Sequence, residues 1–175
     1  MQETPEQYTQ RISGYVKGQD PLRVQRSTAA RLKKIIGRLS RKRLQTRPAP
    51  GKWSIAEILA HLADAELVGS WRIRLVLTQN GVPIQAYDQN AWAETFQYRG
   101  RDPKVSLDTF RVLRASNLAL LQSVPRKLWQ NYGVHEERGN ESIARLVEMF
   151  AGHDLNHLRQ VESIVKVKPS RRKTK

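Results

Sequence analysis

The sequence predicts an all-α protein built as a four-helix bundle. Apolar residues recur at helical spacing over four long segments, and no segment shows a convincing strand pattern. Proline, glycine and capping residues separate these segments. The chain has 175 residues, of which 39% are hydrophobic, so it is long enough for one domain with a substantial core.

The first two helices are expected at residues 21–44 and from Ser54 to about Gln79. A proline at position 21 suits the first turn of a helix. Two prolines and a glycine in residues 46–51 end the first helix and form a loop. Ser54 and Glu57 have the spacing of a capping box, which marks the start of the second helix.

A long aromatic connection, residues 82–105, separates the second helix from the third. It is expected to pack over the bundle, with a short helix at 89–94. The third helix is predicted at 106–123 and the fourth at about 141–165, capped by Asn140. Four helices with one long crossover, between the second and third, are typical of a bundle.

The chain is expected to consist of an N-terminal arm at 1–20, a single domain at 21–165 and a basic disordered tail at 166–175. The formal net charge is +15, and six of the positive charges lie in the last ten residues. A basic surface attracts nucleic acid. However, the sequence has no zinc-finger spacing and no aromatic-glycine RNA-binding motif, so specific nucleic-acid recognition is not expected.

Composition also bears on location and chemistry. The chain has no cysteine, which excludes disulfides, thiolate ligands and a cysteine nucleophile and fits a cytoplasmic protein. The apolar runs are too short to predict a membrane span, and the first residues lack the pattern of a secretory signal.

Three of the four histidines are candidate metal ligands. His153 and His157 are four residues apart, which places both imidazoles on one face of the fourth helix, within its apolar stripe. His61 borders the apolar stripe of the second helix. Burial disfavours imidazolium, so neutral rings in a core need partners, which a divalent ion supplies. Hydrogen-bonded core histidines are the alternative. The fourth histidine, His135, is expected in an exposed polar loop at 132–139, away from the site.

Other metal architectures fit the sequence less well. His153 to His157 superficially matches the H-E-x-x-H motif of zinc proteases, but Asp154 stands in place of the catalytic glutamate. A di-iron carboxylate bundle needs acidic residues on every helix, and residues 21–44 contain none.

Several polar and aromatic residues are candidates for supporting roles. By helical phase Glu57, Asp64 and Gln160 are the polar residues nearest the histidines, and one of them is a candidate for orienting a ring. The alternative is that they are ordinary polar residues of the bundle surface, which is the better interpretation for Glu57. Arg72 shares a face with His61 and is either a candidate for meeting an anionic substrate or, equally well, a solvated side chain. Tyr87 and Trp92 either wall the pocket or, as the better interpretation, pack the crossover.

Two segments resemble the DinB-like (YfiT-type) superfamily. The first is KWSIAEILAHLADAE at 52–66, the second is AGHDLNHLRQVE at 151–162, and YDQNAWA at 87–93 resembles the family's connection. The resemblance covers roughly residues 20–165. It implies an up-down-down-up bundle with a zinc- or nickel-like divalent ion bound by His61, His153 and His157, and frequently a homodimer.

The resemblance also bears on the reaction. Relatives include transferases and isomerases that depend on a low-molecular-weight thiol, so a metal-dependent thiol S-transferase or a hydrolase acting on a small molecule is expected. The alternative is a non-catalytic protein with a structural or vestigial metal site, whose basic surface binds nucleic acid or acidic partners. The catalytic residues remain unassigned at this point.

Overall fold

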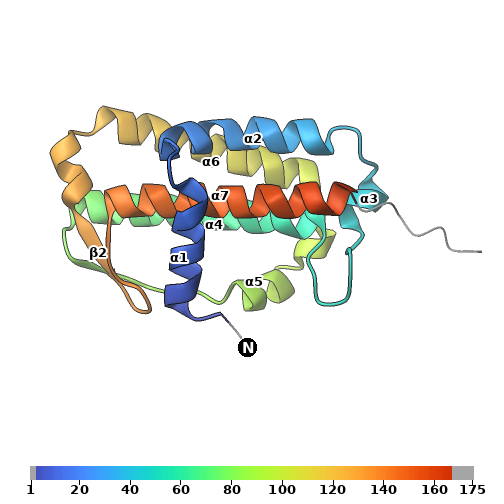
Figure 1. Cartoon of the computed structure of the whole chain (residues 1–175), viewed down its shortest axis with the longest axis horizontal. Helices are drawn as coiled ribbons and strands as arrows, with labels where there is room; N and C mark the ends of the chain where they lie inside the picture. Colours follow the sequence, from blue (N-terminus) through green and yellow to red (C-terminus); the bar gives the residue numbers. More distant parts are fainter. Residues whose placement is uncertain (1–2, 167–175) are drawn as a thin grey trace, which may run out of the picture.

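Four long helices form the body of the molecule in the computed structural model, which describes residues 3–166. They are α2 (Pro21–Ile36), α4 (Ile55–Thr78), α6 (Pro103–Ser123) and α7 (Ile143–Lys166). Figure 1 shows them side by side along the long axis. The predicted all-α bundle is therefore confirmed. Among the described residues, no helix is both long and apolar enough to cross a membrane.

The helix directions follow from the side chains that meet across the bundle. Gln25 of α2 donates to the carbonyl of Val147 at the start of α7, and Arg31 lies 3.6 Å from Glu162 further along both helices. These two helices are therefore parallel. Likewise, Glu66 of α4 contacts Arg114 of α6. Further along both helices Arg74 contacts Asn117, so α4 and α6 are also parallel. The topology is up-down-down-up.

Local sequence explains most of the helix ends. The predicted capping box of α4 is present: Glu57 N–H donates to Ser54 Oγ (3.3 Å), and Ser54 N–H donates to the Glu57 carboxylate (2.7 Å). The first long helix ends at Ile36 rather than residue 44, because the chain turns at Gly37. Ser40 then caps a separate short helix, α3 (Arg41–Gln45).

Three short strands lie at one end of the bundle, where the sequence showed no strand pattern. They are β1 (Val82–Ile84), β2 (Tyr132–His135) and β3 (Gly139–Ser142). β1 pairs with β2 in parallel, and β2 pairs with β3 in an antiparallel hairpin. The crossover between α4 and α6 also contains α5 (Gln89–Thr95), close to the predicted short helix, and a 3-10 turn at Tyr98–Gly100.

Residues 1–20 were expected to be an arm, but α1 (Pro5–Val16) is a helix that crosses α7 (Figure 1). Thr4 and Gln7 form its capping box. Its apolar side, Ile12 and Val16, is almost completely buried. The predicted tail lies outside the described residues except for Lys166, which ends α7.

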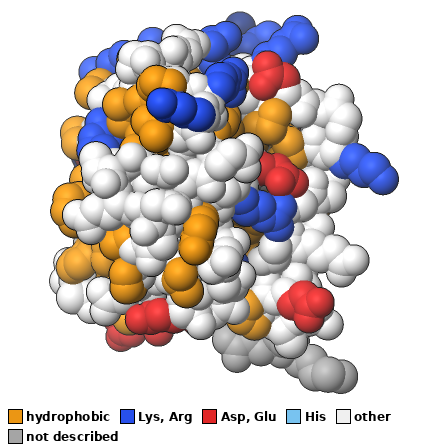
Figure 2. Space-filling model, turned by 90° about the vertical axis from the view of Figure 1, so that its left-hand side faces the viewer, with side chains coloured by type: hydrophobic (Ala, Val, Ile, Leu, Met, Phe, Trp, Pro, Cys, Tyr) orange, Lys and Arg blue, Asp and Glu red, His pale blue; other side chains and the backbone are white. Residues whose placement is uncertain are grey.

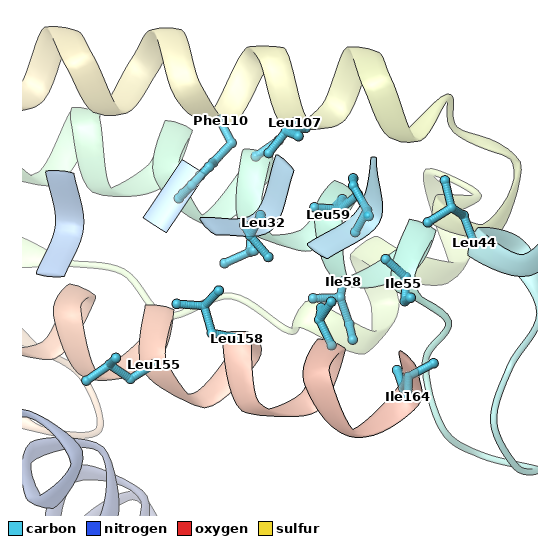
Figure 3. Packing of buried hydrophobic residues seen from close by; sticks show 14 of the residues in the cluster. Leu32, Leu44, Ile55, Ile58, Leu59, Leu107, Phe110, Leu155, Leu158 and Ile164 are labelled. Carbon is cyan, nitrogen blue, oxygen red and sulfur yellow. The ribbon is translucent and has the colours of Figure 1, made fainter. Parts of the chain in front are cut away.

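Two clusters of apolar side chains make up the core. Figure 3 shows residues of the larger one, which draws on α1, α2, α3, α4, α6 and α7. The smaller cluster joins α4 and α7 to the sheet and includes Ile73, Ile84, Trp129 and Leu146.

Candidate metal centre

The imidazoles of His61, His153 and His157 converge between α4 and α7. His153 Nε2 lies 2.9 Å from His61 Nε2 and 3.1 Å from His157 Nε2. Nitrogens bound to one zinc ion at about 2.0–2.1 Å are separated by roughly 3 Å, so this spacing fits a shared ion. Among the described residues they are the one cluster of metal-ligating side chains in which every ligand atom lies within 4.8 Å of the others.

Hydrogen bonding among the rings accounts poorly for this arrangement. Each Nε2 carries either one proton or one in-plane lone pair. His153 Nε2 faces both of the other Nε2 atoms and cannot make a well-directed bond to each. A cation, in contrast, accepts one lone pair from every nitrogen. The donor set and its geometry therefore fit a divalent metal ion.

Burial keeps the three rings neutral. Desolvation lowers the pKa of His61 and His153 well below the ordinary value, and the neighbouring histidines lower both further. Desolvation lowers the pKa of His157 to about 4. Since an imidazole binds a metal only when that nitrogen is unprotonated, these shifts favour coordination.

Of the three predicted orienting residues, Gln160 is the one that contacts a histidine. His157 Nδ1 lies 2.9 Å from Gln160 Oε1. A carbonyl oxygen only accepts, so Nδ1 carries the proton and Nε2 presents its lone pair to the centre of the triad. Glu57 is instead bound to Ser54 and Arg47, and Asp64 pairs with Arg101 at 3.0 Å.

His61 is positioned by packing. Its Nδ1 is buried and makes no hydrogen bond to any described residue. Trp53 lies just before the start of α4, and the centroid of its ring is 5.0 Å from that of the His61 ring.

An open cleft of about 580 Å³ reaches the triad through His153 and His157. Its volume suits a small organic molecule. Its walls come from four parts of the chain. They include Glu3, Tyr8 and Arg11 at the N-terminal helix, Lys52 and Trp53 before α4, Gln89 and Asn90 of α5, and Asn156 and Gln160 of α7. The sequence alone did not predict that α1 forms a wall of the cleft. The signals for this helix are the capping pair Thr4 and Gln7 and the helical spacing of Ile12 and Val16.

The remaining candidates lie away from the three rings. Arg72, which lies eleven residues after His61, is buried and donates to the backbone carbonyl of Gln85. Tyr87 and Trp92 stack on each other with centroids 4.5 Å apart, and neither lines the cleft. The expectation that His135 is exposed was wrong. It is 2% exposed, because its position in β2 turns it inward, and desolvation lowers its pKa.

A buried polar network lies next to the triad and joins three of the long helices. Arg114 binds Glu66 at 2.7 Å and forms two hydrogen bonds to Asp154, which follows His153. Asn117 donates to Glu66 and to Ser70, each at 2.7 Å. Arg114 contacts both carboxylates, while burial raises the pKa of Asp154. Asp154 therefore has a partner that accounts for its burial, unlike the catalytic glutamate of zinc proteases.

The chain is similar to known proteins over most of its length. The model of the DinB superfamily matches residues 26–161. A protein of Oceanobacillus iheyensis named "Putative metal-dependent hydrolase OB0782" is 28% identical over 137 residues, which cover 78% of this chain and 79% of that protein. YfiT of Bacillus subtilis, which carries the same description, is 23% identical over 144 residues, covering 82% of this chain and 81% of YfiT.

Two solved structures are also similar. That of YfiT, described as an unusual four-helix bundle topology, superposes with a TM-score of 0.76 at 22% identity and covers 92% of this chain and 87% of YfiT. A mycothiol-dependent maleylpyruvate isomerase superposes with a TM-score of 0.58 at 10% identity, covering 83% of this chain and 57% of that one.

Proposed function

Because the chain belongs to the DinB superfamily, we propose that it binds one divalent metal ion through His61, His153 and His157 and catalyses a reaction on a small molecule. The observation that carries this proposal is the convergence of three neutral Nε2 atoms beside an open cleft. The names of the relatives as metal-dependent hydrolases support it. Zinc or nickel suits a set of three imidazoles.

Each part of the site has a task in this proposal. A divalent ion held by three protein nitrogens supplies a Lewis acid with open coordination positions. Gln160 holds the proton on His157 Nδ1 and so fixes the ring's orientation. Trp53 packs against His61, and residues of α1 form one wall of the cleft. The site would act on a ligand that enters between α1 and the loop before α4.

The reaction is proposed to be either hydrolysis or transfer to an external thiol. The chain has no cysteine, so thiol chemistry needs a low-molecular-weight thiol as cosubstrate. The similarity in fold to a mycothiol-dependent isomerase supports the thiol-transfer alternative. A cytoplasmic location, where such thiols are abundant, belongs to the same proposal.

A screen on metal-analysed protein tests the proposal. Ester and amide substrates are offered alone, and electrophilic substrates with and without glutathione, mycothiol or bacillithiol. His153→Ala is the control. Turnover that requires the metal and His153 supports an enzyme, and dependence on thiol selects transfer over hydrolysis. Metal that raises the melting temperature without any turnover would instead support the non-catalytic alternative.

We also propose that the protein forms a homodimer through the outer face of α4 and α6. Leu67 and Trp71 of α4 are 55% and 63% exposed, and Val112 of α6 is 55% exposed. The first two lie on one helix face, and the two helices pack together. Figure 2 shows hydrophobic side chains gathered along one flank of the molecule. Exposed apolar patches commonly mark interfaces.

Light scattering after size-exclusion chromatography tests the dimer. Trp71→Glu is expected to give a monomer, whereas Val134→Glu, at an exposed apolar position on β2, leaves the mass unchanged. A wild-type protein that elutes as a monomer at high micromolar concentration contradicts the dimer without affecting the metal site.

A further inference from the structure

One pair of charged residues in the cleft has the geometry of a bound carboxylate. Arg11 Nε and Nη2 donate to the two carboxylate oxygens of Glu3, at 2.7 and 2.8 Å. This two-pronged arrangement is how arginine binds the carboxylate of a ligand. Both residues line the cleft that reaches His153 and His157.

The ion pair between Arg11 and Glu3 is not required to cap the N-terminus of α1. Thr4 and Gln7 already cap α1, with distances of 3.2 and 3.0 Å. Glu3 itself lies before the helix, and the side chains of Arg11 and Glu3 are 36% and 37% exposed. Exposed ion pairs contribute little to stability, so another carboxylate can displace Glu3 at low cost.

Arg11 is also held in a fixed position next to the triad. Its Nη1 donates to Asn156 Oδ1 at 3.0 Å. Asn156 lies three residues after His153 and one before His157, so Arg11 contacts the same turn of α7 that carries these two rings. The centroids of the Tyr8 and Tyr15 rings lie 5.5 and 5.8 Å from the guanidinium carbon.

We infer that the cleft binds a short organic acid whose carboxylate takes the place of Glu3 on Arg11, with the rest of the molecule directed toward the histidine triad. Tyr8 and Trp53 offer aromatic walls for its apolar part, and Lys52 adds a second positive charge. In the free protein Glu3 occupies Arg11 and competes with the ligand. The inference rests on the proposed function, because it names the class of substrate for that site.

The test measures binding of benzoate and of its neutral analogue benzamide by isothermal titration calorimetry. Full-length protein is used both zinc-loaded and after chelator treatment, with the zinc content of each sample determined. Wild type is expected to prefer benzoate. Glu3→Gln should tighten benzoate binding roughly two- to fivefold, the range expected for loss of an exposed ion pair. Arg11→Gln should weaken it by roughly tenfold and abolish the preference.

The chain provides a matched control. Arg111 and Asp108 form an exposed pair on α6, 3.6 Å apart, that does not line the cleft. Asp108→Asn and Arg111→Gln make the same changes of charge and should leave benzoate affinity unchanged. A gain of affinity in Glu3→Gln cannot arise from misfolding, so the inference does not depend on Arg11→Gln being fully stable.

The possible outcomes separate the two proposals. If zinc binds but benzoate affinity is the same in wild type, Glu3→Gln and Arg11→Gln, the carboxylate site is wrong and the metal site stands. If benzoate binding follows Arg11 in protein that takes up no zinc, the carboxylate site stands and the proposed metal function is wrong. Equal effects in the Asp108 and Arg111 controls would also overturn the inference, since they would show that benzoate affinity depends only on the overall charge of the protein.

Discussion

The docking of α1 on the bundle depends on a glycine, and Gly152→Ala tests it. A Cβ atom at this position would lie 2.3 Å from the carbonyl oxygen of Ile12 and 2.5 Å from its Cγ2 atom. Neither atom belongs to a flexible side-chain end that could move aside. The α1 backbone would therefore have to shift by about 1 Å or leave α7, because carbon atoms pack at roughly 3.5–4 Å.

The expected cost follows from opposing effects. Alanine favours a helix interior over glycine by about 1 kcal/mol. Forcing an extra methyl into a packed contact costs about 1–3 kcal/mol. If α1 detaches instead, Ile12 and Val16, which are 0% and 3% exposed, lose burial worth about 1.5–3 kcal/mol each. We expect Gly152→Ala to lower the free energy of unfolding by about 2 kcal/mol, a fall in melting temperature of about 4–8 °C.

Gly14→Ala is the matched control. Gly14 lies within α1, and a Cβ atom there meets nothing within 4 Å. This variant should gain up to about 1 kcal/mol from helix propensity. Urea denaturation followed by circular dichroism measures both. If Gly152→Ala stabilises the protein as much as Gly14→Ala does, the direct contact between α1 and α7 is wrong.

The other predictions concern the triad and its surroundings. In metal-free protein, burial lowers the pKa of His157 from 6.5 to about 4. As pH falls from 6.5 toward 4, the unfolded chain takes up a proton that the folded chain does not, so the protein loses stability over this interval. This loss amounts to about 3 kcal/mol in the free energy of unfolding. His157→Gln should remove it, so the melting temperature of the variant should fall less between pH 6.5 and pH 4 than that of wild type; an equal fall would refute the prediction. Gln160→Ala should weaken zinc binding by about 10- to 100-fold in a chelator competition, whereas equal affinity would show that the hydrogen bond to His157 is dispensable. Arg114→Met leaves Asp154 and Glu66 uncompensated and should cost about 3–5 kcal/mol in urea denaturation; a loss below 1 kcal/mol would contradict this.

The long helices were predictable because their signals are local. The capping box at Ser54 and Glu57 and the prolines around position 48 act within a few residues of the chain. The strands are only three or four residues long, too short to show a readable alternation. His135 was misplaced for this reason: its polar neighbours indicate a loop, and only the pairing of β2 with β1 turns the ring inward.

The candidate site was partly predictable. The spacing of His153 and His157 places both on one face of a helix, and this holds in isolation. His61 meets these two rings only because α4 packs against α7. Residue spacing cannot establish that packing, and the prediction of it came from the family resemblance. The α1 wall of the cleft was missed because it depends on tertiary docking. Its contacts, such as Arg11 with Asn156, join residues 145 positions apart.

The most direct test of the metal centre is the zinc stoichiometry of purified protein after dialysis against a metal buffer, measured by inductively coupled plasma mass spectrometry. Wild type should hold one ion per chain, and His61→Ala, His153→Ala and His157→Ala should each hold much less while remaining folded by circular dichroism. A wild type that retains no ion, or single variants that retain as much as wild type, would contradict the proposal that these three side chains bind it.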